Sequence, residues 1–137
     1  MRAPSQTPPT RLTILVALTF GTAACGEDFG QQYRENYNSA FEAICECFPE
    51  NPVICAFSIS ESRAECLTET YEASDSATQE VFDCALDALA ENAECIDEAT
   101  QSCDEDAVSV CSDRATDQAR ACGTIPEATQ ATLDACD

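Results

Sequence analysis

The chain has 137 residues, enough for one small domain, with 11 cysteines, 26 acidic residues, six arginines, no lysine and no histidine. Cysteine at this density is typical of disulfide scaffolds in exported proteins. Because the commonest general base and the amine nucleophile are missing, the composition argues against an enzyme, and the acidity argues against nucleic acid and anionic lipid headgroups as partners.

The first 24 residues differ in character from the rest of the chain. They contain no acidic residue, carry Arg2 and Arg11, and hold a short apolar run, Leu12–Phe20, followed by small residues. This order is typical of a secretory signal peptide. The run is shorter than the ~20 residues that a membrane-spanning helix needs. We therefore expect residues 1–24 to be removed on export.

The segment Thr22–Cys25 resembles the bacterial lipobox, in which the cysteine becomes the first mature residue and carries acyl chains. The resemblance implies a bacterial lipoprotein held at a membrane through Cys25, with residues 25–28 as anchor and tether. Gly26 in place of aspartate implies the outer membrane of a two-membrane cell. Thr22 stands where that family usually has leucine and also suits ordinary signal peptidase. A soluble, secreted effector or inhibitor acting in trans is therefore the alternative.

The number of cysteines agrees with lipidation. Eleven is odd, and lipid on Cys25 would leave ten cysteines for five bridges. From Cys25 onward, 26 acidic residues face four arginines, a formal charge of −22 that repels itself. Each disulfide typically adds ~2–4 kcal/mol to a small domain of this kind. We expect the bridges to hold residues 29–137 together as one cysteine-rich acidic domain.

The first helix is predicted over Phe29–Phe48, before Pro49 and Pro52. Large apolar residues recur along it at steps of three and four, which places them on one face. They are Phe29, Tyr33, Tyr37, Phe41, Ile44 and Phe48. This stripe is expected to be core, and it is the best place for a partner wherever other helices leave it uncovered.

The next helix has two possible starts. Asn51 as N-cap with Pro52 in the first position predicts a long helix reaching Tyr71. The rival is the capping box Ser58-x-x-Glu61, which would shorten the helix and leave Cys55 in a loop. The longer helix is preferred.

Three further helices are predicted from similar capping patterns. They begin at Ser76-x-x-Gln79, Ser102-x-x-Glu105 and Thr124-x-x-Glu127, and Gly123 ends the second of them. The last is expected to run to Cys136. Short connections favour antiparallel neighbours. The predicted fold class is all-α: a small, disulfide-stapled bundle of four to five antiparallel helices.

Six cysteines form three pairs eleven residues apart, a spacing of about three helical turns that places both members on one face. They are Cys55 and Cys66, Cys84 and Cys95, and Cys111 and Cys122. The pairs recur after 29 and 27 residues, which suggests a repeated helical unit. The layout resembles helical hairpin proteins with twin paired cysteines, in geometry only.

Antiparallel helices bring together residues whose numbers have a constant sum. Two sets compete: Cys84–Cys122 with Cys95–Cys111 around a turn at residue 103, or Cys55–Cys95 with Cys66–Cys84 around Asp75. We prefer the first set because Cys103 is then free to reach Cys136. The remaining hypotheses are Cys45–Cys66 and Cys47–Cys55. Connectivity does not follow from sequence alone.

Metal binding has little support. Cys45-x-Cys47 lacks the usual zinc spacing and the chain has no histidine, so no cofactor is expected. Five acidic residues crowd one predicted turn and are weak calcium candidates without an EF-hand loop. They are Asp97, Glu98, Asp104, Glu105 and Asp106. A solvated acidic surface is the preferred interpretation, and a calcium-binding surface protein is a second alternative.

The sequence thus favours a non-enzymatic, lipid-anchored structural or binding module outside the cytoplasm. Its membrane contact would be the acyl chains on Cys25, and any protein partner is not identified by the sequence.

Overall fold

The computed structural model describes residues 28–136, so the predicted signal peptide and Cys25 lie outside the described residues. Six helices make up the regular structure of this part. They are α1 (Phe29–Cys47), α2 (Pro52–Ala56), α3 (Glu61–Glu72), α4 (Ser76–Thr100), α5 (Glu105–Ala121) and α6 (Glu127–Asp134). The all-α, disulfide-stapled fold class is confirmed. Across the same residues, none of the helices is both long and apolar enough to cross a membrane.

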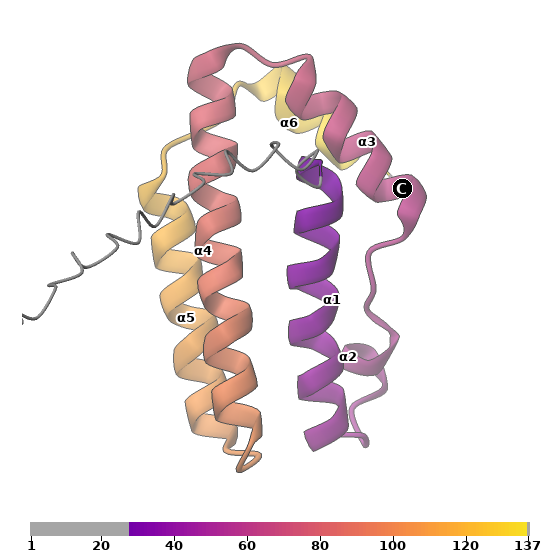
Figure 1. Ribbon diagram of the computed structural model, residues 1–137, viewed down its shortest axis with the longest axis vertical. Coiled ribbons are helices and arrows are strands. Elements are labelled where there is room, and N and C mark those ends of the chain that lie inside the picture. The colour runs from indigo at the N-terminus through magenta and orange to yellow at the C-terminus, as the bar shows by residue number, and fades with distance from the viewer. Residues whose placement is uncertain (1–27, 137) are drawn as a thin grey trace, which may run out of the picture.

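Figure 1 shows the helices in two groups. Helices α4 and α5 form an antiparallel hairpin, and α1 lies beside α4 and runs in the same direction. The parallel arrangement of α1 and α4 is possible because the segment that contains α2 and α3 returns the chain from the end of α1 to the level of its start. Helices α3 and α6 pack together near the start of α1, whereas α2 and the α4–α5 turn lie at its other end.

Helix α2 begins at the expected Asn51 cap with Pro52 in its first position, whereas α4, α5 and α6 begin at other capping residues than those expected. Asp75 caps α4 in place of Ser76, and Asp104 caps α5 in place of Ser102. Aspartate accepts a backbone hydrogen bond as well as serine does, and its charge also favours the positive end of the helix dipole. Before α6, Pro126 replaces the expected Thr124 without any side-chain cap. Gly123 follows α5 with φ of 119°, as expected for the residue after a helix.

The predicted long second helix is wrong, and so is its rival start at Ser58. The chain breaks between α2 and α3, and Ser60 caps α3 by accepting a hydrogen bond from the Arg63 N–H at 3.1 Å. The break is held by Asn38 of α1. Its Oδ1 accepts from the Ile59 N–H at 2.7 Å, and its Nδ2 donates to the Ile59 carbonyl at 3.1 Å. Ile59 is 6% exposed, so a tertiary contact overrides local helix propensity here.

The break also removes the proposed repeat. Cys55 lies on α2 and Cys66 on α3, so the first pair of the eleven-residue spacing does not share one helix. Cys84 and Cys95 do share α4.

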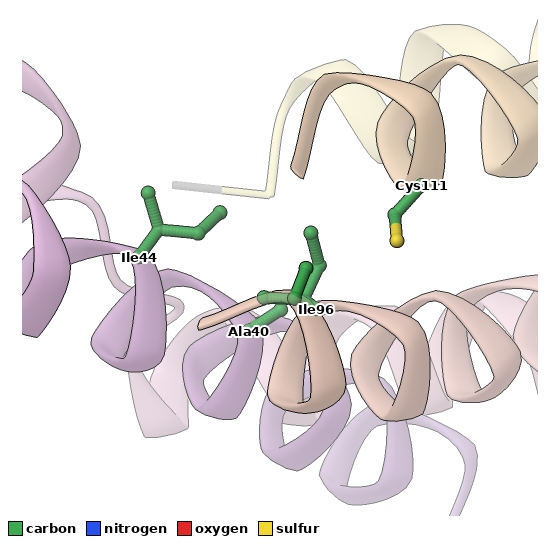
Figure 2. Packing of buried hydrophobic residues seen from close by; sticks show 5 residues of the cluster. Ala40, Ile44, Ile96 and Cys111 are labelled. Carbon is green, nitrogen blue, oxygen red and sulfur yellow. The ribbon is translucent and has the colours of Figure 1, made fainter. Parts of the chain in front are cut away.

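The core lies where α1, α4 and α5 meet. Figure 2 shows Ile96 of α4 between Ile44 of α1 and Cys111 of α5. Ile96 is 0% exposed, and Ala40 and Ala99 complete the cluster. Because most of these side chains are small, the core is thin, and cross-links carry a large share of the stabilisation.

The start of α1 packs directly on α3. A Cβ at Gly30 would overlap the backbone carbonyl of Ala64, so only glycine permits this approach. The Gly30 N–H donates to Thr68 Oγ1 at 2.9 Å, and that hydroxyl donates to Asp28 Oδ1 at 2.7 Å. Asp28 also caps α1 through Gln31. The residue expected in the tether therefore belongs to the folded domain.

Candidate functional site

Five disulfides join all ten cysteines of the described residues. Two of them, Cys84–Cys122 and Cys95–Cys111, are the predicted pairs. They lie along the α4–α5 hairpin with Cα–Cα distances of 5.6 and 5.8 Å. The constant-sum argument works here because two straight helices run antiparallel across one short turn.

The other three predicted pairs, Cys45–Cys66, Cys47–Cys55 and Cys103–Cys136, are wrong. The structure has Cys45–Cys55, Cys47–Cys103 and Cys66–Cys136. The sequence predicted one long helix from Asn51 to Tyr71. Because that helix breaks, α2 stays beside the end of α1, and the α4–α5 turn lies at the same end. The packing of α6 on α3 brings Cys136 to Cys66 instead of Cys103.

The bridges also limit the chemistry of the cysteines. Metal binding and thiol exchange need a thiolate, and both sulfurs of the Cys45-x-Cys47 motif are in bridges. This motif joins the end of α1 to α2 on one side and to the α4–α5 turn on the other. Its role in the structure is to cross-link three segments at one end of the molecule.

The calcium candidates are spread over two helix ends. Asp97 and Glu98 lie in the last turn of α4, Asp104 caps α5, and Glu105 and Asp106 lie in its first turn. Asp104 Oδ1 accepts from the Ala107 N–H at 3.1 Å. In the part of the chain that the structure describes, no three acidic or cysteine side chains gather where a metal ion could be held.

Acidic side chains at the surface have few basic partners. Over residues 28–136, one pair of opposite charges has its nitrogen and oxygen within 4.0 Å. Arg120 Nη1 lies 3.6 Å from Asp117 Oδ1, and both side chains are exposed. The helix caps interact with backbone N–H groups instead. Hydrogen bonds from Thr78 hold the pKa of Asp75 below its usual value.

The aromatic stripe of α1 forms a continuous row of rings, which we call the aromatic row: Phe29, Tyr33, Tyr37, Phe41 and Phe57. Ring centroids along it are 4.6 to 6.3 Å apart. At its first end, Phe29 stacks on Tyr71 at 4.8 Å and contacts Phe82 at 5.4 Å. Burial raises the pKa of Tyr33 and Tyr37. This part of the stripe is packed, as expected for core.

The other end of the row is open. Phe57, in the break after α2, is 53% exposed and contacts Phe41 at 5.7 Å. Beside it lies a cavity of about 520 Å³ between α1 and α2. We call this cavity the α1–α2 groove. Its wall on α1 includes Phe41, Glu42 and Glu46, and its wall on the α2 side includes Ile54 and Phe57.

Sequence reasoning missed this groove. Phe57 falls inside the predicted long helix from Asn51 to Tyr71, and the break that exposes it depends on Asn38, which is 21 residues from Ile59. The nearby Pro49 and Pro52 were the available indication that the chain reverses here.

Comparison with known proteins gives no relative. No family model matches the chain, and neither does any curated protein or solved structure.

Proposed function

We propose that the protein is a lipid-anchored, non-enzymatic structural or binding module that works outside the cytoplasm. The observation that carries the proposal is the set of five bridges between distant segments. Such extensive cross-linking indicates an oxidising, extracytoplasmic compartment. A lipobox-like segment ending at Cys25, the cysteine left without a bridge partner when the other ten pair, supports the anchor.

The start of the domain supports a short tether. Two residues, Gly26 and Glu27, separate Cys25 from the α1 cap at Asp28. Even a fully extended chain of this length spans only about 10 Å. Acyl chains on Cys25 would therefore keep the start of α1 next to the membrane. The α1–α2 groove, at the far end of a 19-residue helix, would lie up to about 28 Å further away.

Intact mass spectrometry of the protein purified from its native membrane tests the anchor. We expect the mass of residues 25–137 plus acyl chains, minus ten hydrogens for five bridges. Cys25→Ser should abolish the added mass and the release of the signal peptide at that bond. Thr22→Leu is the matched control and should leave lipidation intact or raise it. An unmodified mature chain in the wild-type protein, found in the soluble fraction, would favour the secreted effector instead.

Membrane fractionation gives a second, independent measurement. Acylation buries many methylenes at ~0.8 kcal/mol each, so an acylated chain should stay with membranes after washing in high salt. A chain held only by charge would be released, because salt screens electrostatic attraction.

A further inference from the structure

We propose that the α1–α2 groove binds a cationic amphipathic segment of a partner protein. Apolar side chains of the segment would enter between Phe41, Ile54 and Phe57, and its lysine or arginine side chains would face Glu42 and Glu46. This inference rests on the binding role proposed above and names the partner chemistry, but it does not depend on the lipid anchor.

The apolar half of the argument is the exposure of large side chains around the groove. Phe57 lines the groove in the break after α2 and is 53% exposed. Val53 of α2 does not line the groove but precedes the lining residue Ile54 and is 65% exposed. A small, highly charged domain has few large apolar residues to leave in water. A groove of about 520 Å³ is large enough for the apolar anchors of a short helix or strand.

The walls of the groove are fixed before any partner binds. The Cys45–Cys55 bridge holds α2 against α1, with a Cα–Cα distance of 5.0 Å. The two hydrogen bonds between Asn38 and Ile59 hold the other end of the segment that carries Phe57. Binding therefore requires little ordering of the domain, and less of the interaction energy is lost to conformational entropy.

Charge selects the occupant. Glu42 and Glu46 lie one turn apart on α1, are both exposed, and line the groove. No arginine of the described residues lies within ion-pair distance of either carboxylate. The formal charge of −22 from Cys25 onward adds a long-range attraction for cations. The same charge disfavours an acidic peptide, an anionic membrane or a second copy of this chain in the groove.

The test uses the full exported chain with its bridges formed and a labelled peptide of leucine and lysine with apolar residues at helical spacing. Fluorescence anisotropy at physiological salt measures the Kd. We expect Phe57→Ala to weaken binding about tenfold, because it removes the largest exposed anchor. Glu42→Gln with Glu46→Gln should weaken it about fivefold.

Two controls match these changes elsewhere on the surface. Val110→Ala removes an apolar side chain that is 66% exposed on α5, and Glu94→Gln with Glu98→Gln makes the same charge change on α4. Both should stay within about twofold of the wild-type Kd, because neither position lines the groove. Equal losses from the two glutamate pairs would show diffuse charge attraction and overturn the proposal.

Peptide controls separate the remaining outcomes. A peptide of the same composition with its apolar residues scrambled should bind at least about fivefold more weakly. Equal binding of the scrambled peptide would overturn the proposal, as would an unchanged Kd for Phe57→Ala. Circular dichroism checks that each variant keeps its helices. The variants all carry the same group at Cys25, so differences in Kd between them report on the groove, and a failed groove and a failed anchor are distinguishable.

Discussion

The α4–α5 hairpin and the α1–α3 region are stabilised by different means. After Phe82 the chain contains no aromatic residue, and the buried residue of α5 is Cys111. The hairpin is held by two bridges along its length. In the α1–α3 region, rings pack from Phe29 to Phe57, and glycine lets two helix backbones meet. The difference indicates that cross-links fasten α5 to α4, because α5 buries a cysteine and no large apolar side chain.

Removing both hairpin bridges should have the largest effect. In the variant with Cys84, Cys95, Cys111 and Cys122 all changed to alanine, we expect the free energy of unfolding of the hairpin to fall by about 6 kcal/mol in total. Amide hydrogen exchange should then show loss of protection across α5 while α1 keeps its protection.

The matched control is Cys45→Ala with Cys55→Ala, which removes a bridge of sequence separation 10 in the α1–α3 region. That change should lower stability by about 3 kcal/mol or less and leave α5 protected. Protection of α5 that survives the loss of both hairpin bridges would show that packing, and not cross-linking, holds the hairpin.

The same contrast explains how much could be predicted from the sequence. The hairpin is local: one turn and one spacing determine which cysteines meet, so Cys84–Cys122 and Cys95–Cys111 were predictable. The other pairings depend on the break at Ile59, which an amide 21 residues earlier in the chain imposes. Helix existence and fold class followed from apolar periodicity in the first helix and from capping patterns in the later ones, whereas caps moved by one or two residues because serine and aspartate compete as N-caps.

The groove was less accessible to sequence reasoning than the fold. Its residues come mainly from α1, α2 and the segment after α2, and the pattern around Phe57 suits a helix equally well. The hydrogen bonds of Asn38 to Ile59 break the helix at this point and leave Phe57 exposed, and the local sequence does not indicate them. The calcium candidates illustrate a related point: acidic residues close in sequence need not converge on one point in space.

Gly30→Ala, in the α1–α3 region, should have the next largest effect on stability. Alanine favours helix by up to ~1 kcal/mol over glycine, but the added methyl meets the backbone of Ala64, which has little room to move. We expect a net loss of about 3 kcal/mol in urea unfolding, with unchanged bridges by thiol assay. Gly123→Ala, where the strain comes from a positive φ, is the control and should cost only about 1–2 kcal/mol. A neutral Gly30→Ala would mean that α1 and α3 separate easily.

Alkaline pH should destabilise the α1–α3 region, with a smaller effect than Gly30→Ala. The hydrogen bond to Asp83 raises the pKa of Tyr71, and burial raises the pKa of Tyr33 and Tyr37. A raised pKa in the folded state means that stability is fully present below the unfolded value near 10 and is lost as pH rises through the folded values.

Thermal melts between about pH 9 and about pH 12 measure this loss, with a thiol assay to confirm intact bridges. Tyr33→Phe removes one titrating group and should flatten the decline. Hydrogen exchange should place the loss in α1 and α3, because the hairpin carries no tyrosine. A decline that begins in α5 would contradict the assignment of the rings as the stabilising feature of the first half.

Salt should have the smallest effect and act on both halves. Over residues 28–136, most acidic side chains have no arginine within ion-pair distance. The Debye length falls from ~30 Å at 0.01 M to ~8 Å at 0.15 M, so added salt should raise the melting temperature by screening the repulsion between them. The increase should be larger in the variant without hairpin bridges, because cross-links no longer oppose the repulsion.

A diffuse acidic surface predicts that magnesium and calcium act alike at matched ionic strength. A calcium site at Asp97, Glu98, Asp104, Glu105 and Asp106 would instead give a saturable, calcium-selective shift, since magnesium dehydrates reluctantly and demands stricter geometry. Because these carboxylates are divided between two helix ends and Asp104 is engaged as a cap, we expect the diffuse response. A calcium-only stabilisation at micromolar concentration would show that the two helix ends move together around the ion.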